Sequence, residues 1–562
     1  DNASTPSTCT LCPVGCSMAL DERDNEIVRT RSIENPAVND VWLCDKGWFG
    51  YEFASHPDRL KTPLMRKNGK LVEASWEEAF SAIASNVRAS QNGKLAALGG
   101  NALTIEENYL FQQLVRKGFN TPHIDSRVGT PLISIEEEGL PPGMKSQPDK
   151  FKELNFVLLL GLDITEEFPV LWLRLKEAIN LGTQAVFIGH YAPEIASHLK
   201  ESILHAPGDE LSLLQSHLEK ISKHSENAKT AIFVGRQYLA SPHRKVVLTE
   251  LLKLQGSRDN FTINIMEGRG NYLGARFAGV HPELGPFNEA LSSKGLNSIE
   301  ILQTAAQTGW DYLHIVSANP AGKMPKALWE KARKATKFLV VQDLFLTETA
   351  KNADIVLPTL CFFEKEGHFL SISGKIEQLN PGIILPHGIF SDGHIFKEIA
   401  KYLDLIAIDA NFIELIKHKA DEAFKTDHRI ELTSSPDTIK ANFVQHDKEN
   451  EQEKENSGIL ALAATFAQPL FDRGVRMLHN LRLRHLAKDP KVEIHPEDGK
   501  RLGIQDGDNV NLSHDGATIS AVAALNSRIA RGAILLPMGF EELNSNALSP
   551  NLINGAPIVV TK

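Results

Sequence analysis

The chain has few cysteines, no basic tract and no long apolar run. Only 5 cysteines occur in 562 residues, which excludes the class of small disulfide-dense secreted domains and indicates a reducing compartment. The formal net charge is −10 and lysine and arginine form no cluster, so nucleic acid is not an expected partner. No apolar run reaches the roughly 18 residues of a membrane span, so we expect no direct membrane insertion.

The sequence also lacks a signal-peptide pattern and an initial methionine. It reaches its first cysteine after eight residues, and we expect that the numbering begins inside a longer polypeptide or after processing. At about 150 residues per domain, the length predicts three to four domains. A hydrophobic content of 42% is enough to build substantial cores.

Four of the five cysteines follow the pattern C-x2-C-x3-C-x27-C, in CTLCPVGC and then WLCDKG. Three closely spaced thiolates can bind three corners of a cuboidal cluster, and the fourth thiolate returns from later in the chain. Gly15, directly before the third cysteine, allows the backbone a tight turn. We predict that one [4Fe–4S] cluster is bound by Cys9, Cys12, Cys16 and Cys44.

A structural zinc site is the main alternative for these thiols. Zinc ligands usually come as two C-x2–4-C pairs, whereas here a triplet is followed by one distant cysteine. Lys46, two positions after Cys44, is a candidate for a cation that neutralises an anionic cluster or for an electron relay. The alternative for Lys46 is an ordinary surface lysine.

Three segments resemble the molybdopterin oxidoreductase superfamily. They are CTLCPVGC, ENPAVNDVWLCDKGWFGYEF and PDRLKTPLMRKNGKLVEASWEEAF, and a weaker resemblance runs through almost the whole chain. Within the superfamily the chain most resembles the family of large iron–sulfur subunits of bacterial NADH:quinone oxidoreductase (respiratory complex I). The resemblance implies an electron-transfer subunit whose cluster lies in a domain descended from a molybdenum enzyme. Trp48 stands where this family usually has arginine, which weakens the relay role for Lys46.

Strand and helix patterns alternate through the middle of the chain. Phe156–Leu160 (FVLLL) is a short apolar run typical of a strand buried on both faces, and similar units recur up to residue 342. Capping boxes at Ser75 and Thr104 predict helices. We predict an α/β chain with a [4Fe–4S] domain at 1–60 and two doubly wound α/β subdomains at 61–433.

The C-terminal part changes character twice. Residues 434–460 are predicted to be a linker, because His446–Ser457 (HDKENEQEKENS) is charged and polar and has no aromatic residue. An exposed helix with Glu–Lys pairs is the alternative for this stretch. Residues 461–562 become rich in strand patterns and Asp-Gly turns, and VEIHPEDGKRLGIQDGDNV resembles the β-barrel domain of molybdopterin enzymes, which closes over the dinucleotide.

A molybdenum site is not expected. Enzymes of this superfamily usually bind the metal through Cys, selenocysteine, Ser or Asp after the first α/β unit, and the corresponding NTPHIDSR contains no cysteine. Asp125 and Ser126 are the remaining candidates for that role. Loops at residues 268–270, 317–320 and 343–350 follow strands, where α/β folds place ligands, but we expect them to be inherited loops that bind nothing. Cys361 is expected to be a packed core thiol.

The cysteine pattern predicts an iron–sulfur protein, and the resemblance implies that it is an electron-transfer subunit of a bacterial NADH:quinone oxidoreductase, without molybdopterin and without catalytic residues on this chain alone. The resemblance implies partners in the peripheral arm of complex I, namely the flavin-bearing NADH-oxidising subunit and the connecting subunits. It also implies a cytoplasmic location, peripheral on the cytoplasmic face of the inner membrane. The alternatives are a catalytic molybdenum or tungsten enzyme, such as a formate dehydrogenase, and a zinc-bearing structural module.

Overall fold

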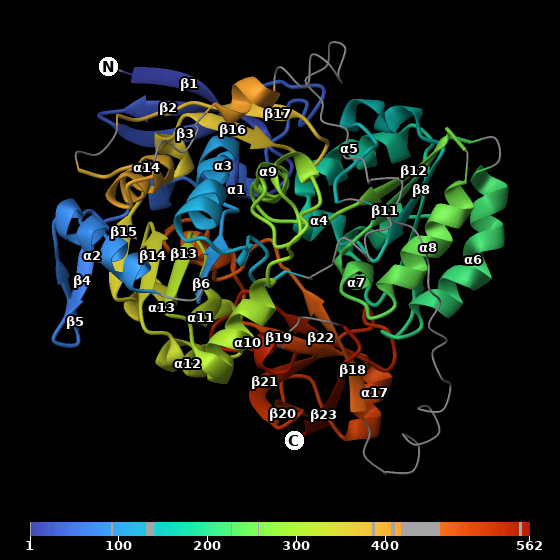
Figure 1. Cartoon of the computed structure of the whole chain (residues 1–562). Helices are drawn as coiled ribbons and strands as arrows, with labels where there is room; N and C mark the ends of the chain where they lie inside the picture. The colour runs from blue at the N-terminus through green and yellow to red at the C-terminus, as the bar shows by residue number, and fades with distance from the viewer. Residues whose placement is uncertain are drawn as a thin grey trace.

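The chain folds around three large sheets and two small ones in the residues that the computed structural model describes. These residues are 2–90, 94–130, 140, 142–225, 228–256, 258–384, 388–405, 411–416, 461–549 and 554–562. In Figure 1 the N-terminal sheet lies at the top, two α/β layers lie side by side beneath it, and the C-terminal barrel lies at the bottom. The expected linker at 434–460 falls outside the described residues.

The N-terminal sheet has three antiparallel strands, β1 (Asn2–Thr8), β2 (Ser17–Arg23) and β3 (Glu26–Ser32). The short helix α1 (Asp45–Phe49) packs on β3, where Thr30 donates its hydroxyl to the carbonyls of Gly47 and Trp48. Two strands, β2 and β3, thus lie between the third and fourth cysteines of the pattern, and β3 leads the chain back toward Cys44.

A seven-stranded sheet forms the first α/β layer, in the order β5-β4-β15-β14-β13-β6-β7. Its five strands from β15 to β7 are parallel, and β4 and β5 form an antiparallel hairpin at one edge. The strands are β4 (Leu64–Lys67), β5 (Lys70–Glu73), β6 (Leu95–Gly99), β7 (Ile124–Asp125), β13 (Tyr312–Val316), β14 (Leu339–Asp343) and β15 (Ile355–Pro358).

A five-stranded parallel sheet forms the second α/β layer and is inserted in sequence between β7 and β13. Its order is β10-β9-β8-β11-β12, so β8, the FVLLL segment, is central and fully buried as expected. The strands are β8 (Phe156–Leu160), β9 (Gln184–Gly189), β10 (Glu201–Leu204), β11 (Thr230–Val234) and β12 (Phe261–Ile265).

Helices cover both faces of each α/β sheet, which confirms the doubly wound prediction. In the seven-stranded sheet, Phe80, Phe111 and Phe396 pack on one face, and Leu302 and Trp329 pack on the other. The longer helices are α2 (Trp76–Ala89), α3 (Ile105–Gln113), α5 (Pro169–Asn180), α6 (Glu210–Ser225), α8 (Arg244–Gln255), α9 (Tyr272–Ala278), α10 (Ser298–Thr308), α12 (Lys326–Ala335), α14 (Asp392–Tyr402) and α17 (Pro496–Leu502). The shorter ones are α4 (Ile164–Glu167), α7 (Arg236–Leu239), α11 (Pro320–Lys323), α13 (Glu348–Lys351) and α16 (Val475–Leu478).

Local signals fix several helix ends. Ser75 and Thr104 each accept a hydrogen bond from the backbone N–H three residues on, and Glu78 and Glu107 accept one from the backbone N–H of Ser75 and Thr104, so both capping boxes are confirmed. Helix α3 continues into a single π-helical turn that ends at Gly118.

The C-terminal domain is a closed six-stranded barrel in the order β18-β22-β19-β21-β20-β23. Asp515 and Gly516 both have positive φ, as a two-residue hairpin turn between β20 and β21 requires. The barrel prediction is confirmed. The strands are β18 (Ala461–Ala467), β19 (Lys491–Ile494), β20 (Asn509–His514), β21 (Ala517–Leu525), β22 (Ala533–Pro537) and β23 (Pro557–Thr561).

Segments distant in sequence close over the N-terminal sheet. The hairpin of β16 (Gly367–Leu370) and β17 (Ile376–Leu379) lies beside β1, and Thr8 donates its hydroxyl to the carbonyl of Gln378. From the C-terminal domain, Asn480 donates its amide to the carbonyl of Phe49. The cluster domain is thus held by later parts of the chain as well as by its own strands.

A buried ion pair joins residues 54–59 to residues 359–364. Arg59 donates to both carboxylate oxygens of Glu364, at 2.7 and 2.8 Å, and its side chain is 6% exposed. The same guanidinium also donates to the carbonyls of Ala54 and Thr359. Removal of the guanidinium would leave a buried carboxylate without a counter-charge.

We therefore expect Arg59→Met to lower the free energy of unfolding by about 3–5 kcal/mol, measured by urea denaturation. The matched control is Arg88→Met, because Arg88 pairs with Asp404 at the surface, where the side chains are 52% and 87% exposed. The control should change stability by less than about 1 kcal/mol. Equal effects of the two substitutions would contradict the role given to the buried pair.

Candidate functional site

The four cysteines of the N-terminal pattern line one cavity of about 840 Å³. Cys9 and Cys16 close the loop between β1 and β2, where the Cys9 amide donates to the Cys16 carbonyl at 2.8 Å. Cys44 is the N-cap residue of α1. The hairpin and the helix start therefore bring together the thiols that the spacing predicted as cluster ligands.

Burial raises the pKa values of the four cysteines, with a smaller contribution from the neighbouring thiols at Cys9, Cys12 and Cys16. Burial raises the pKa of Cys12 to about 12, and the nearby Cys44 contributes to that rise. Burial also raises the pKa of Cys9 and Cys16, again with a contribution from their neighbouring cysteines. Four such groups can be thiolates together only if a metal centre compensates their charge.

Gly15 has no room for a side chain. Its φ is +70°, and a Cβ atom would lie 2.8 Å from Cε1 of Phe369 in β16. The cysteine loop therefore packs directly against β16 of the later hairpin. Glycine is therefore required at position 15 for two reasons, the tight turn expected from the sequence and the close contact with Phe369.

Lys46 lines the same cavity from α1. Burial raises the pKa of Cys44, and the positive charge of Lys46 partly opposes that rise. The structure thus places a cation beside the thiols, and the role of Lys46 toward a cluster stays a prediction. Trp48 is half-buried against the hydrophobic core and is not among the described residues that line the cavity.

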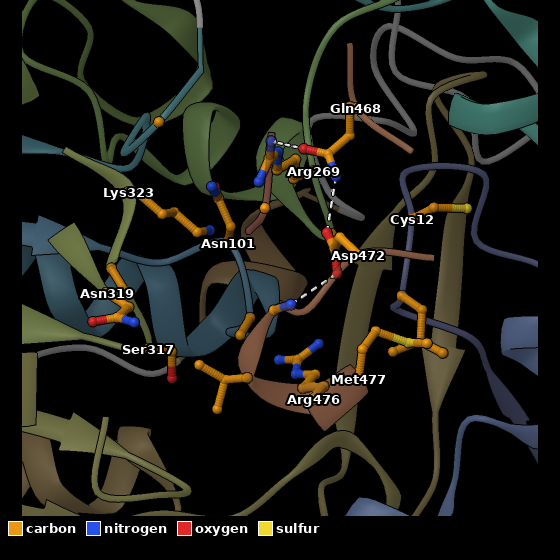
Figure 2. Close-up of a pocket in the computed structure, with 18 of the residues that line it drawn as sticks. Cys12, Asn101, Arg269, Ser317, Asn319, Lys323, Gln468, Asp472, Arg476 and Met477 are labelled. Carbon is orange, nitrogen blue, oxygen red and sulfur yellow. Dashed lines mark hydrogen bonds between the residues drawn. The ribbon is translucent and has the colours of Figure 1, made fainter. Parts of the chain in front are cut away.

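Three loops that follow parallel strands form another wall of the cavity. Residues 268–270 follow β12, residues 317–319 follow β13, and residues 343–348 begin at the end of β14. Figure 2 shows the side chains of Asn101, Asn319 and Lys323 around the central space. Because parallel strands end at one edge of a sheet, loops from both α/β layers meet here.

Cationic side chains gather in this part of the cavity. They are Arg236, Arg269, Lys323 and Arg476. Burial lowers the pKa of Arg236 to about 10 and that of Lys323 to about 7. Arg236 has two side-chain nitrogens without a hydrogen-bond partner among the described residues. Acidic residues such as Glu167, Asp343 and Asp472 share this lining. The unpartnered nitrogens of Arg236, rather than the lining as a whole, therefore suit an anionic ligand, since an anion would offset the cost of burying their charge.

A short polar chain connects this lining to the C-terminal domain. Arg269 donates to Gln468, and Gln468 donates to Asp472 at 2.8 Å. Figure 2 shows both bonds beside the cavity. The C-terminal domain therefore supplies part of the wall.

The two residues that the sequence offers as molybdenum ligands, Asp125 and Ser126, differ in their access to the cavity. Asp125 is fully buried in a bidentate pair with Arg127 and also accepts from the Ser298 amide, so it is fully engaged and lies outside the cavity lining. Ser126 lines the cavity, and its hydroxyl has no partner among the described residues. The carboxylate does not fit the role of metal ligand, whereas the hydroxyl does.

Cys361 is buried, as expected, and its Sγ accepts a hydrogen bond from Arg59 at 3.8 Å. It also lines the cavity, which its sequence context did not indicate. The sequence analysis missed Arg236 and Arg476 altogether, because neither belongs to a recognisable motif. Only the position of Arg236 directly after a buried strand and Gly235 could have signalled a ligand-facing loop.

Family models match most of the chain. The model for molybdopterin oxidoreductase matches residues 59–402, that for the molybdopterin oxidoreductase Fe4S4 domain matches residues 3–56, and that for the molydopterin dinucleotide binding domain matches residues 472–556. The fold resembles that of the acetylene hydratase from Pelobacter acetylenicus, with a TM-score of 0.72 at 13% identity over 99% of this chain and 100% of that chain.

The curated relatives include subunits of NADH-quinone oxidoreductases and of formate dehydrogenases. NADH-quinone oxidoreductase subunit 3 of Thermus thermophilus is 31% identical over 68% of this chain and 48% of its own length. The chain therefore spans about half of that relative. A NADH-quinone oxidoreductase subunit of Rhizobium meliloti is 25% identical over 98% of this chain and 72% of its own length. F420-dependent formate dehydrogenase 1 subunit alpha of Methanococcus maripaludis is 24% identical over 96% of this chain and 95% of its own length.

The ligand assignment predicts that Cys12→Ala loses cluster iron, because one corner of the cluster would lack its thiolate. Iron content and visible absorption of anaerobically purified protein measure this loss. Cys361→Ala is the control, since Cys361 is a buried cavity thiol outside the predicted ligand set, and it should keep its iron. Unchanged iron in Cys12→Ala would exclude Cys12 as a ligand.

Proposed function

Because the chain belongs to the molybdopterin oxidoreductase family, we propose that it acts as the large iron–sulfur, electron-transfer subunit of a bacterial NADH:quinone oxidoreductase. The observation that carries this proposal is the convergence of four buried or half-buried thiols at one cavity wall. Cys9, Cys12, Cys16 and Cys44 would hold one [4Fe–4S] cluster that exchanges single electrons. The names of the Thermus and Rhizobium relatives support the choice of complex.

Lys46 would act on the cluster through its charge. Lys46 lies on the side of α1 that faces the cavity, near both Cys12 and Cys44. Burial raises the pKa of both thiols, and the charge of Lys46 partly opposes this rise. A nearby cation stabilises the more negative, reduced state of a cluster. Lys46 is therefore proposed as a residue that raises the reduction potential.

Exposed apolar side chains in the N-terminal domain and in residues 478–486 support a partner subunit there. They are Val28, Val41, Trp42, Phe49, Leu478, Leu481 and Leu486, all more than one-third exposed. Asn480 donates to the Phe49 carbonyl, so the segment that carries Leu478 and Leu481 lies beside Phe49. Exposed aromatic residues within an apolar patch are typical of protein interfaces.

Exposed basic residues lie in the same C-terminal segment. Residues 478–488 contain exposed Arg482, Arg484 and Lys488 but no acidic residue, in a chain of net charge −10. The segment therefore suits a partner with an acidic rim. We propose connecting subunits of the peripheral arm as these partners, which would place the chain on the cytoplasmic face of the inner membrane. Among the described residues, no helix has both the length and the apolar character needed to span a bilayer.

A catalytic molybdenum- or tungsten-pterin enzyme is the second candidate, favoured by the cationic cavity and by the formate dehydrogenase relatives. In that case Arg236, Arg269, Lys323 and Arg476 would hold the anionic groups of the cofactor, and Ser126 would be the nearest ligand candidate of the two that the sequence offered. A pterin-bound metal would supply two-electron redox chemistry. The expected absence of molybdopterin therefore stays a prediction.

The electron-transfer proposal predicts one reversible one-electron signal in a redox titration followed by electron paramagnetic resonance. In Lys46→Met the midpoint potential should become more negative by roughly tens of millivolts, because the reduced cluster loses a nearby cation. Lys70→Met is the control, since exposed Lys70 lies in β5 at the sheet edge and outside the cavity lining, and it should leave the potential unchanged. A wild-type protein without a reversible cluster signal would contradict the proposed function.

A further inference from the structure

Two histidines and an aspartate from opposite ends of the chain converge at the cavity. His56 follows the short 3-10 helix Glu52–Ser55, Asp58 lies two residues later, and His479 caps the C-terminus of α16. One ring nitrogen of each histidine and one carboxylate oxygen of Asp58 all lie within 4.8 Å of one another. We propose that His56, Asp58 and His479 form a binding site for a divalent transition-metal ion, with Zn²⁺ as the best match. Such a site would be separate from the proposed electron-transfer function.

The rings are held in place by packing. The His479 ring stacks on Phe345 with centroids 3.7 Å apart and planes 12° apart. The His56 ring meets His479 edge to face at 4.8 Å and 84°. Phe345 also contacts His56 edge-on at 6.0 Å. Both imidazoles are therefore pre-positioned, which lowers the entropy cost of binding a metal.

The hydrogen bonds of His479 leave one ligand atom of its ring available. His479 Nδ1 lies 2.7 Å from the Val475 carbonyl, which can only accept, so this nitrogen carries the proton and Nε2 keeps its lone pair. A ring N–H bonded to a carbonyl is the usual arrangement behind a metal-binding histidine. His479 Nε2 makes no hydrogen bond within the described part of the chain.

His56 and Asp58 are oriented together. The Asp58 amide donates to His56 Nδ1 at 3.2 Å, and the same nitrogen lies 3.8 Å from Asp58 Oδ2. The His56 side chain is 16% exposed, whereas that of Asp58 is 73% exposed. The carboxylate is therefore free to rotate toward an ion that the two rings hold.

The donor set selects the class of metal. Two imidazoles and one carboxylate suit zinc and similar divalent ions, whereas calcium and magnesium prefer oxygen ligands only. Tetrahedral zinc holds its nitrogen and oxygen ligands at about 2.0–2.2 Å, so they lie roughly 3.3–3.5 Å apart. Small side-chain rotations close the separation of up to 4.8 Å to that value. Three protein ligands leave a fourth position for water.

A bound ion would connect the end of the cluster domain to the C-terminal domain. Asp58 and His479 both line the cavity, so the ion would lie at its wall and bridge two segments that are far apart in the sequence. Such a bridge stabilises the folded state by linkage, because the unfolded chain does not bring the three ligands together. Zinc should therefore raise the melting temperature of the protein.

The test uses anaerobically purified protein with its iron retained, dialysed against EDTA and then equilibrated with micromolar Zn²⁺. Wild type should bind one zinc per chain without loss of iron. Loss of a residue that only hydrogen-bonds to a metal ligand typically weakens metal binding about 10–100-fold. Because His56 and His479 would be ligands themselves, His56→Gln and His479→Gln should each weaken zinc binding by at least that factor. The matched control is His485→Gln, since exposed His485 lies in the same C-terminal segment outside the triad, and it should bind as wild type does.

X-ray absorption at the zinc edge separates this site from the cysteines. The proposal expects nitrogen and oxygen neighbours with imidazole scattering and no sulfur. Sulfur neighbours, no zinc uptake by wild type, or undiminished binding by His479→Gln with unchanged iron content would each overturn it. Iron content and the melting temperature without zinc show whether each variant is folded.

Discussion

The burial of four thiols beside one another is the constraint on which this structure depends. Burial and mutual repulsion raise the pKa of the thiols, so they form a stable set only around a centre that neutralises their charge. The surrounding chain is arranged to hold them. The hairpin loop after β1 carries three, α1 begins at the fourth, and Phe369 presses against Gly15 from a strand far along the sequence.

The second feature of the molecule is a cavity at which both α/β sheets and the C-terminal domain meet. The cationic residues of its mixed lining and the thiols share one continuous space, so an anionic ligand bound by those residues would lie close to the cluster site. The fold is shared with an acetylene hydratase, which shows that this architecture alone does not decide the reaction. The residues that line the cavity decide it, and Asp125, locked in its pair with Arg127, is not one of them.

The sequence was sufficient where the physical signal is local. The cysteine spacing, the capping boxes at Ser75 and Thr104, the FVLLL strand and the Asp515-Gly516 turn each depend on a few neighbouring residues, and the structure contains each feature. The sequence was insufficient where residues meet only through the fold. No local pattern distinguishes Arg236 or Arg476 from other arginines, or indicates that His56 would touch His479. The insertion of one sheet between two strands of another has no local signal either.

The most direct test of the account is elemental analysis of anaerobically purified protein for iron, molybdenum and tungsten, with the visible spectrum of the same sample. An electron-transfer subunit should contain about four irons, as one cubane cluster requires, with neither molybdenum nor tungsten. Stoichiometric molybdenum or tungsten beside the iron would contradict the account and make the cationic cavity the active site of an enzyme.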